Sequence, residues 1–404
     1  MRALCLVLLV VLLAATACGG SSSSETGPSG CEAQADAIFW GGVQWVELGQ
    51  ALAKNSSECV EYFISVPPED NDRSALRDAA AFEEMRTLSP RIRPVAEIRF
   101  TGETGWREWV TGPHPDFAEG RTFYDAGVEA RRRMEQSGLD VENGETWALN
   151  ELSVEVLEDA PGWRDEVREF MRGLYEGEAG MPKARGIVFN IFVPSDMTDV
   201  TAYKASLQAW LEDDAFWSDL DRYVDFFAEE VYPSPLTWGV ADASLETRAE
   251  YLNDYVFHML ELAGAGPDTA AAAQGFLGSA YVPLANAAWP HEGIGKTNVI
   301  SAQTMSAFVS SQVDAIRSYP GAQSEDKRHR IGFAWAPNAK EPGYSRKGRN
   351  MVLTRLASAI RAVYEEEPDE EMGACGTPGE DDLCAADVEG ASLNDAWKTF
   401  ASWD

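Results

Sequence analysis

GIVFNIFV, residues 186–193, is apolar at nearly every position and lies between two stretches with helical character. Such a run is typical of a parallel strand that is buried on both faces because helices cover the sheet. Other short apolar runs precede and follow it, and stretches with helical period separate them. This alternation predicts the α/β class with a parallel sheet.

Eight apolar runs along the chain are predicted to be strands, and they cover residues 38–40, 60–66, 95–100, 146–152, 186–193, 236–240, 284–289 and 331–336. The helices are expected at 74–88, 123–137, 163–175, 202–231, 245–262, 269–280 and 351–365. Eight successive strand and helix pairs predict a (β/α)8 barrel, or TIM barrel, with an enlarged helical insertion after strand six. An open doubly wound sheet is the alternative, although no Gly-x-Gly-x-x-Gly turn follows a strand. The seventh strand is the least distinct, since its residues could also extend the preceding helix.

The N-terminus has the layout of an export signal, with Arg2 before an apolar run over residues 3–15. That run is shorter than the ~20 residues a membrane-spanning helix needs. The sequence Ala-Thr-Ala-Cys at 15–18 resembles the lipobox of bacterial lipoproteins, which implies removal of signal peptide 1–17 and a lipid on Cys18. A cleaved signal with an incidental cysteine is the alternative. Residues 18–30 then form a Gly/Ser linker, so we expect a protein anchored in the cell envelope and facing the periplasm or the exterior.

Four further cysteines lie in the body of the protein, which we divide into a barrel domain, 31–370, and a C-terminal appendage packed on it, 371–404. An even number of cysteines in an oxidising compartment predicts two disulfides, which we assign to Cys31 with Cys59 and to Cys375 with Cys384. A zinc site is the alternative, but no C-x-x-C pair occurs and the four histidines are scattered. We therefore expect neither a metal nor a cofactor.

The net charge of −33 argues against nucleic-acid binding, because few basic residues are available to neutralise phosphates. The sequence also contains no Gly-x-Ser-x-Gly elbow, no phosphate-binding loop and no His-Glu-x-x-His motif. Serine hydrolases, nucleotide-binding enzymes and zincin proteases are therefore disfavoured. The expected partners are a carbohydrate and, through the lipid, a membrane, and no oligomeric state is predicted.

Asn150-Glu151 ends the fourth predicted strand, where a TIM barrel carries its active site. The pair resembles the Asn-Glu dipeptide of the clan A retaining glycoside hydrolases. The resemblance implies that Glu151 is the acid/base and that Asn150 contacts the sugar 2-hydroxyl. The alternative is that these residues cap the following helix.

A retaining mechanism needs a second carboxylate about 5 Å from the first. The resemblance to clan A implies that it follows strand seven, where Glu292 is the candidate nucleophile. Glu97 is the second candidate, because a charge inside a buried strand must be paired or functional. An ion pair of Glu97 with Arg99 or another basic residue is the structural alternative.

Aromatic residues gather in or just after the predicted strands. Indole rings stack on pyranose faces while amides and carboxylates bind the hydroxyls, although core packing is the alternative for each tryptophan. The candidate substrate-binding residues are Trp40, Trp106, Trp147, Trp238, Trp289 and Trp335, with Asn190 and Asp242 near strand ends. Together these features predict an envelope-anchored retaining glycoside hydrolase. The alternative function is a non-catalytic surface lipoprotein that binds glycans or a protein partner.

Overall fold

The computed structural model describes the parts of the chain within residues 35–40, 49–50, 52–53, 60–66, 79–100, 105–112, 120–153, 162–191, 209–230, 270–286 and 330–334. The chain divides into two units, residues 1–32 and 33–404, and every described residue belongs to the second. The signal peptide, the linker, all six cysteines and the C-terminal appendage lie outside the described residues. The lipid anchor and both disulfides therefore remain predictions.

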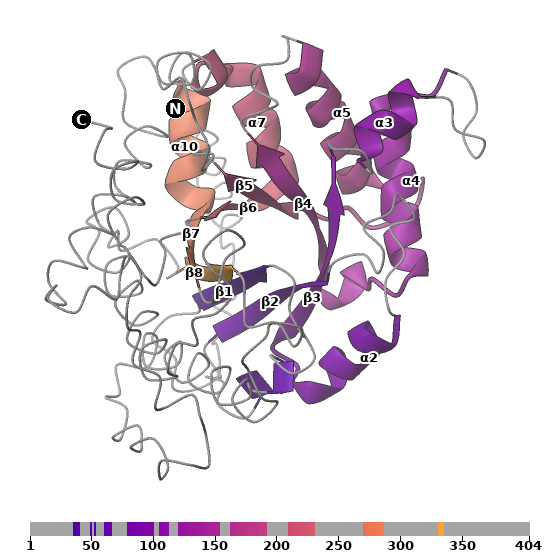
Figure 1. Ribbon diagram of the computed structural model, residues 1–404, viewed down its shortest axis with the longest axis vertical. Helices are drawn as coiled ribbons and strands as arrows, with labels where there is room; N and C mark the ends of the chain where they lie inside the picture. Colours follow the sequence, from indigo (N-terminus) through magenta and orange to yellow (C-terminus); the bar gives the residue numbers. More distant parts are fainter. Residues whose placement is uncertain are drawn as a thin grey trace, which may run out of the picture. The chain divides into compact units, whose positions relative to one another are not determined.

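Eight parallel strands pair in sequence order, and the last pairs with the first to close a barrel (Figure 1). The strands are β1 Ala35–Trp40, β2 Val60–Val66, β3 Ile92–Arg99, β4 Thr146–Ser153, β5 Gly186–Ile191, β6 Val224–Glu230, β7 Tyr281–Asn286 and β8 Arg330–Ala334. This parallel sheet confirms the predicted α/β class and is consistent with a TIM-like barrel.

The described helices lie outside the sheet (Figure 1). They are α2 Ala79–Leu88, α3 Trp106–Thr111, α4 Phe123–Gln136, α5 Gly162–Glu176, α7 Asp214–Tyr223 and α10 Ala271–Ala280, with a 3-10 turn at Val141–Asn143. A capping box of Thr122 and Asp125 starts α4, and Gly138 with a φ of +106° follows its end. Helices α4 and α5 approach closely at Gly127 and Gly173, because a Cβ at either glycine would collide with backbone atoms of the other helix.

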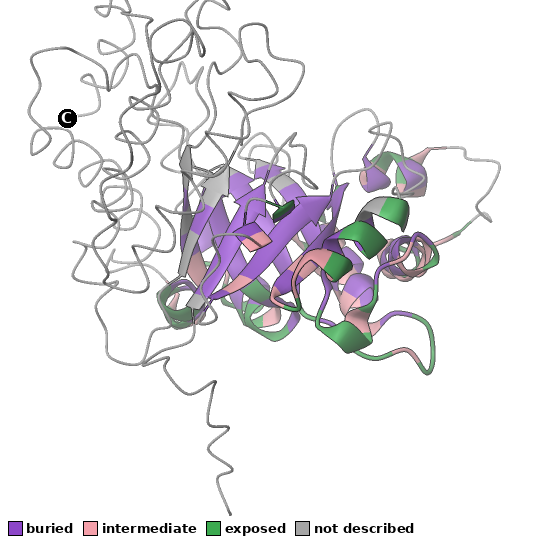
Figure 2. Cartoon of the chain, turned by 90° about the horizontal axis from the view of Figure 1, so that it is seen from below, coloured by how far each residue is buried: buried purple, intermediate pink, exposed green. Residues whose placement is uncertain are grey.

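Alternate residues of each strand belong to two separate apolar clusters. The outer cluster joins the strands to the helices and includes Leu149, Val188 and Phe227 together with helical residues such as Phe170. The barrel-filling cluster consists of Ile38, Trp40, Phe63, Val95, Ala148, Ile187, Phe189, Phe226, Ala228, Val282 and Leu284. Figure 2 shows the strands as mostly buried, as expected for a sheet with a filled interior and covering helices.

The strand registers group the inner residues of alternate strands into levels, as in other parallel barrels. One level contains Ile38, Val95, Ile187 and Val282, the next contains Ser65, Ala148, Ala228 and Gly332, and the next contains Trp40, Glu97, Phe189 and Leu284. The side chains of the middle level are small, which leaves room for the bulky side chains of the levels above and below it. At Gly332, for example, a Cβ would collide with the Leu284 side chain. Glu97 therefore lies in a bulky level toward the carboxyl ends of the strands.

The sixth strand was wrongly predicted at 236–240, since β6 occupies Val224–Glu230. The sequence pattern predicts a helix over 202–231, which includes these residues. Helix α7 runs directly into β6, and the backbone N–H of Val224 still donates to Leu220 at the helix end. No glycine or proline marks the boundary between Tyr223 and Val224, so the sequence carries no break signal there.

The seventh strand begins three residues earlier than predicted, because α10 ends at Ala280 and Tyr281 is already extended. The predicted helix 269–280 agrees closely with α10. The connection from β6 to β7 covers residues 231–280, and its part before residue 270 lies outside the described residues. Among the described helices, none is both long and apolar enough to cross a membrane.

Candidate functional site

A buried carboxylate, Glu97 of β3, lies in the barrel interior with donors on both neighbouring strands. Ser65 of β2 donates its hydroxyl to Glu97 Oε2. Asn150 Nδ2 of β4 donates to Glu97 Oε1 at 2.6 Å. Glu97 is 6 % exposed, and Ser65 and Asn150 are buried as well. We call these three residues the inner cluster.

The other three residues at the level of Glu97 are apolar. Trp40, Phe189 and Leu284 share its level, and the rings of Trp40 and Phe189 lie 5.8 Å apart. Apolar neighbours disfavour a charged carboxylate, whereas hydrogen bonds to both of its oxygens favour it. The inner cluster can therefore hold an ionised carboxylate in a place with little water.

The side-chain oxygen of Asn150 is a buried acceptor with no hydrogen-bond partner among the described residues. The amide orientation follows from chemistry, because only the NH2 group can donate to the Glu97 carboxylate. The oxygen must therefore point away from Glu97. A buried acceptor of this kind is normally satisfied, so its position fits a hydroxyl or N–H group supplied by a ligand or by water.

Strand β4 contains a bulge at the Asn150-Glu151 dipeptide. Leu149 is in register with Val188 and Leu152 with Asn190, so two residues of β4 face the single residue Phe189 of β5. Leu149 and Leu152 both belong to the outer cluster, whereas Asn150 points inward to Glu97. Bulges are common beside active sites, where they redirect a strand. The helix-cap alternative is wrong, because both residues lie within β4 and α5 begins only at Gly162.

A second buried Asn–Glu pair joins β5 to β6. Asn190 Nδ2 donates to Glu229 Oε2 at 2.9 Å, and both side chains are at most 2 % exposed. Asn190 and Glu229 are in register with each other. Along their strands they directly follow Phe189 and Ala228, which belong to the barrel-filling cluster. They therefore lie on the outer face of the sheet, and we call them the outer pair. Asn190 was expected at the barrel mouth, and the structure places it on the other face.

Glu229 was missed in the sequence because residues 224–230 were assigned to a helix. The signal that could have found it is the pattern of Phe226, Phe227 and Ala228, which are followed by two acids. An apolar run that ends in carboxylates is the same pattern that drew attention to Asn150-Glu151.

Two of the predicted sugar-binding tryptophans are core residues. Trp147 is fully buried on the outer side of β4, and its Nε1 donates to the Ala184 carbonyl at 2.9 Å. Trp106 lies in α3 rather than in a loop, is 2 % exposed, and packs with its ring centroid 5.9 Å from that of Phe170. Neither ring has a free face for a sugar. Trp40 is also buried, at 3 % exposed, but it is an inner residue at the level of Glu97.

The remaining predicted site residues are Trp238, Asp242, Trp289, Glu292 and Trp335, and all five lie outside the described residues. The segments that follow the carboxyl ends of the strands contain them. The described part of the chain therefore includes the strand ends of the candidate site and few of its loop residues.

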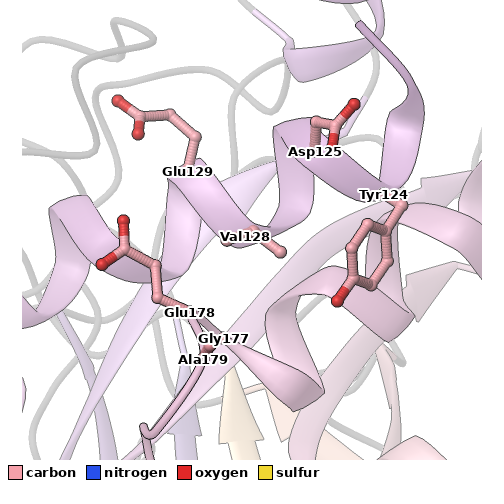
Figure 3. A pocket seen from close by; sticks show the side chains of 7 residues that line it. All are labelled: Tyr124, Asp125, Val128, Glu129, Gly177, Glu178 and Ala179. Carbon is pink, nitrogen blue, oxygen red and sulfur yellow. The ribbon is translucent and has the colours of Figure 1, made fainter.

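A surface hollow of about 340 Å³ lies between α4 and the segment after α5 (Figure 3). Tyr124, Asp125, Val128 and Glu129 line it from α4, and residues 177–179 line it from the other side. No strand residue contributes, so the hollow is separate from the inner cluster. Among the described residues, no group of three His, Cys, Asp or Glu side chains could hold a metal ion.

Comparisons with known proteins do not identify a family. No protein-family model matches the chain, and no curated protein matches it. A solved structure of a Rhizobium etli pyruvate carboxylase variant with the allosteric activator acetyl coenzyme-A is 10% identical, with a TM-score of 0.35, and the match covers 83% of this chain and 25% of that chain. This chain therefore spans about a quarter of the length of that carboxylase chain.

The second solved structure is one of the tandem GH20 catalytic modules in the pneumococcal exo-beta-D-N-acetylglucosaminidase. It is 9% identical with a TM-score of 0.21, and the match covers 82% of this chain and 86% of that chain. Similarities this low carry no argument about function, which must come from the site itself.

Proposed function

We propose that the protein is an envelope-anchored glycoside hydrolase with a retaining mechanism, tethered through a lipid on Cys18. The observation that carries the proposal is the buried Glu97 carboxylate, which receives hydrogen bonds from Ser65 and Asn150 inside the barrel. A carboxylate kept in an apolar interior costs stability unless it is paired or used. Its place toward the carboxyl ends of the strands is where barrel enzymes bind their substrates.

In this proposal Glu97 is the nucleophile, because its two donors favour the ionised form that attacks the anomeric carbon. Glu151 is the acid/base and protonates the leaving oxygen. The bulge at the Asn150-Glu151 dipeptide supports this role, because bulges redirect strands beside active sites. Asn150 Oδ1 accepts a hydrogen bond from a sugar hydroxyl, and Trp40 supplies an apolar surface beside it.

The proposal also includes the complete (β/α)8 architecture, with helices on all sides of the barrel, the helical insertion after β6 and the stapled appendage. Glu292 is the competing candidate for the nucleophile. The two assignments differ in which carboxylate forms the covalent glycosyl ester, so they can be separated chemically.

The first experiment tests the purified lipid-free body on a panel of aryl glycosides. We expect turnover of at least one substrate with retention at the anomeric carbon, as followed by proton NMR of the first product. Glu151→Gln and Glu97→Gln should each lower turnover strongly, for Glu97→Gln by about 10³-fold, while Glu229→Gln in the outer pair serves as the matched control. The proposal fails if no glycoside is cleaved, or if the Glu151→Gln and Glu97→Gln variants both turn over substrate like the wild type.

The second experiment identifies the nucleophile. A 2-deoxy-2-fluoro glycoside of the active sugar should trap the covalent ester, and peptide mass spectrometry should locate the label on Glu97. A label on Glu292 would contradict our assignment of Glu97 while leaving the enzyme class intact. Glycan binding without turnover, unchanged in Glu97→Gln, would instead support the non-catalytic lipoprotein.

A further inference from the structure

Ser65 differs from the other residues at its level of the barrel interior. Its level partners on β4, β6 and β8 are Ala148, Ala228 and Gly332, and none of them has a polar side chain. The bulky residues of the neighbouring levels require small side chains here, and alanine meets that requirement on two strands. Packing alone therefore does not explain a hydroxyl at position 65.

The hydroxyl of Ser65 has a defined partner. It donates to Glu97 Oε2, while Asn150 donates to the other carboxylate oxygen. Ser65 is 3 % exposed, so water has little access to this hydrogen bond. Both oxygens of the carboxylate are thereby held from the two adjacent strands, and the plane of the carboxylate is restricted.

We propose that Ser65 is a positioning residue that keeps Glu97 ionised and oriented toward the carboxyl ends of the strands. The inference rests on the proposed function only for its consequence in catalysis, because the hydrogen bond itself is independent of any substrate. A hydroxyl that donates to a carboxylate favours the charged form, and its loss in an apolar interior raises the pKa of the carboxyl group.

Other charged residues with described side chains also occupy inner positions of the strands, and they are Asp36, Glu61, Arg93 and Arg99. Asp36 pairs in register with Glu61 and with Arg330 at the amino end of the barrel. Three levels of side chains, which contain Phe63, Ile38 and Ser65, separate Asp36 from Glu97. Arg99 occupies an inner position on the carboxyl side of Glu97, and Ser65 variants leave all of these charges unchanged.

The test is a carbon-13 NMR titration of the Glu97 carboxyl group in the intact body of the protein, with Glu97→Gln used to assign the signal. We expect Ser65→Ala to raise the pKa of Glu97 by about one unit or more. Ser65→Cys keeps the size but weakens the donor, so its pKa should lie between those of wild type and Ser65→Ala. Ser137→Ala removes another buried serine, whose hydroxyl donates to the backbone carbonyl of Arg133 at 2.8 Å, and should leave the titration unchanged.

The same variants are then compared in the pH profile of kcat/KM on the active glycoside. The apparent pKa of the acid limb of this profile should rise by the same amount as the pKa of Glu97. A folded Ser65→Ala protein whose Glu97 titrates as in the wild type would overturn the role of Ser65. If the titration shifts but the wild type cleaves no glycoside, the role of Ser65 stands and the proposed function fails.

Discussion

The barrel contains two Asn–Glu pairs that are chemically alike and lie on opposite faces of the same sheet. In the inner cluster Asn150 donates to Glu97, and in the outer pair Asn190 donates to Glu229. Each pair joins adjacent strands, each is buried, and each leaves the asparagine oxygen without a partner among the described residues. Residue type alone therefore does not distinguish a candidate reaction site from a structural link.

The face of the sheet makes the difference. The inner cluster belongs to the barrel interior, which a ligand can approach from the carboxyl ends of the strands. The outer pair lies on the side that the helices cover, where a buried hydrogen bond holds β5 and β6 in register. We therefore expect substitutions in the inner cluster to affect activity most, and substitutions in the outer pair to affect stability most.

The largest expected effect is on turnover. Glu97→Gln should lower kcat/KM by about 10³-fold, because the amide cannot act as a nucleophile. Glu229→Gln should leave kcat/KM within about threefold of the wild type, since it keeps a hydrogen bond on the outer face. Steady-state kinetics on the same glycoside measures both variants. Equal losses of kcat/KM in the two variants would mean that the outer pair is as important for activity as the inner cluster.

A smaller loss of activity is expected at the asparagines. Asn150→Ala should lower kcat/KM by about 10- to 100-fold, because it removes one donor to Glu97 and the acceptor proposed for a sugar hydroxyl. Asn190→Ala should leave kcat/KM nearly unchanged. If the Asn190 variant loses as much activity as the Asn150 variant while remaining folded, the outer pair belongs to the functional site.

Stability should show the opposite order. Glu229→Ala leaves the Asn190 amide buried without this acceptor and should lower the free energy of unfolding by about 2 kcal/mol. Glu97→Gln should change it by less than about 1 kcal/mol, because functional carboxylates in apolar sites are seldom optimal for stability. Urea denaturation at neutral pH measures both values. A larger loss in Glu97→Gln would identify the inner cluster as mainly structural.

The smallest effect is expected at a carboxylate outside the barrel. Burial alone would raise the pKa of Glu129 on α4, but hydrogen bonds from Arg132 and Arg133 outweigh it and lower the pKa below its usual value. A lowered pKa in the folded state gives stability that is present above the unfolded value and disappears as the pH falls through the folded value.

Glu129→Gln should therefore lower the free energy of unfolding by about 0.5 kcal/mol at pH 7. At a pH below the folded pKa of Glu129, the variant and the wild type should have the same free energy of unfolding. Urea denaturation at pH 7 and at that lower pH measures both values. A difference that persists in acid would mean that packing of the side chain, rather than its charge, stabilises α4.

Strands with strong apolar runs were predictable from the sequence. Residues 60–66, 146–152 and 186–193 agree closely with β2, β4 and β5, because parallel strands in such a barrel must be apolar on both faces. Strand β6 was not predictable in the same way, since α7 passes into it without a turn residue. The boundary there is set by pairing with β5 and β7, which are separated from it along the chain.

The candidate site was partly predictable. Asn150 drew attention through its dipeptide and Glu97 through its charge inside an apolar run, and the structure brings the two into contact. Ser65 carried no signal, because a serine in an apolar run is common and its partner lies 32 residues away. Only the register of β2 against β3 brings the hydroxyl to the carboxylate.

The amino-acid sequence by itself determined the α/β class and most of the strands, because burial requires apolar residues at fixed local spacing. The tertiary structure decided which face of the sheet each polar residue occupies, since alternation, register and the bulge in β4 all depend on neighbouring strands. For that reason Asn150 and Asn190 read alike along the chain, although one lies inside the barrel and the other faces the covering helices.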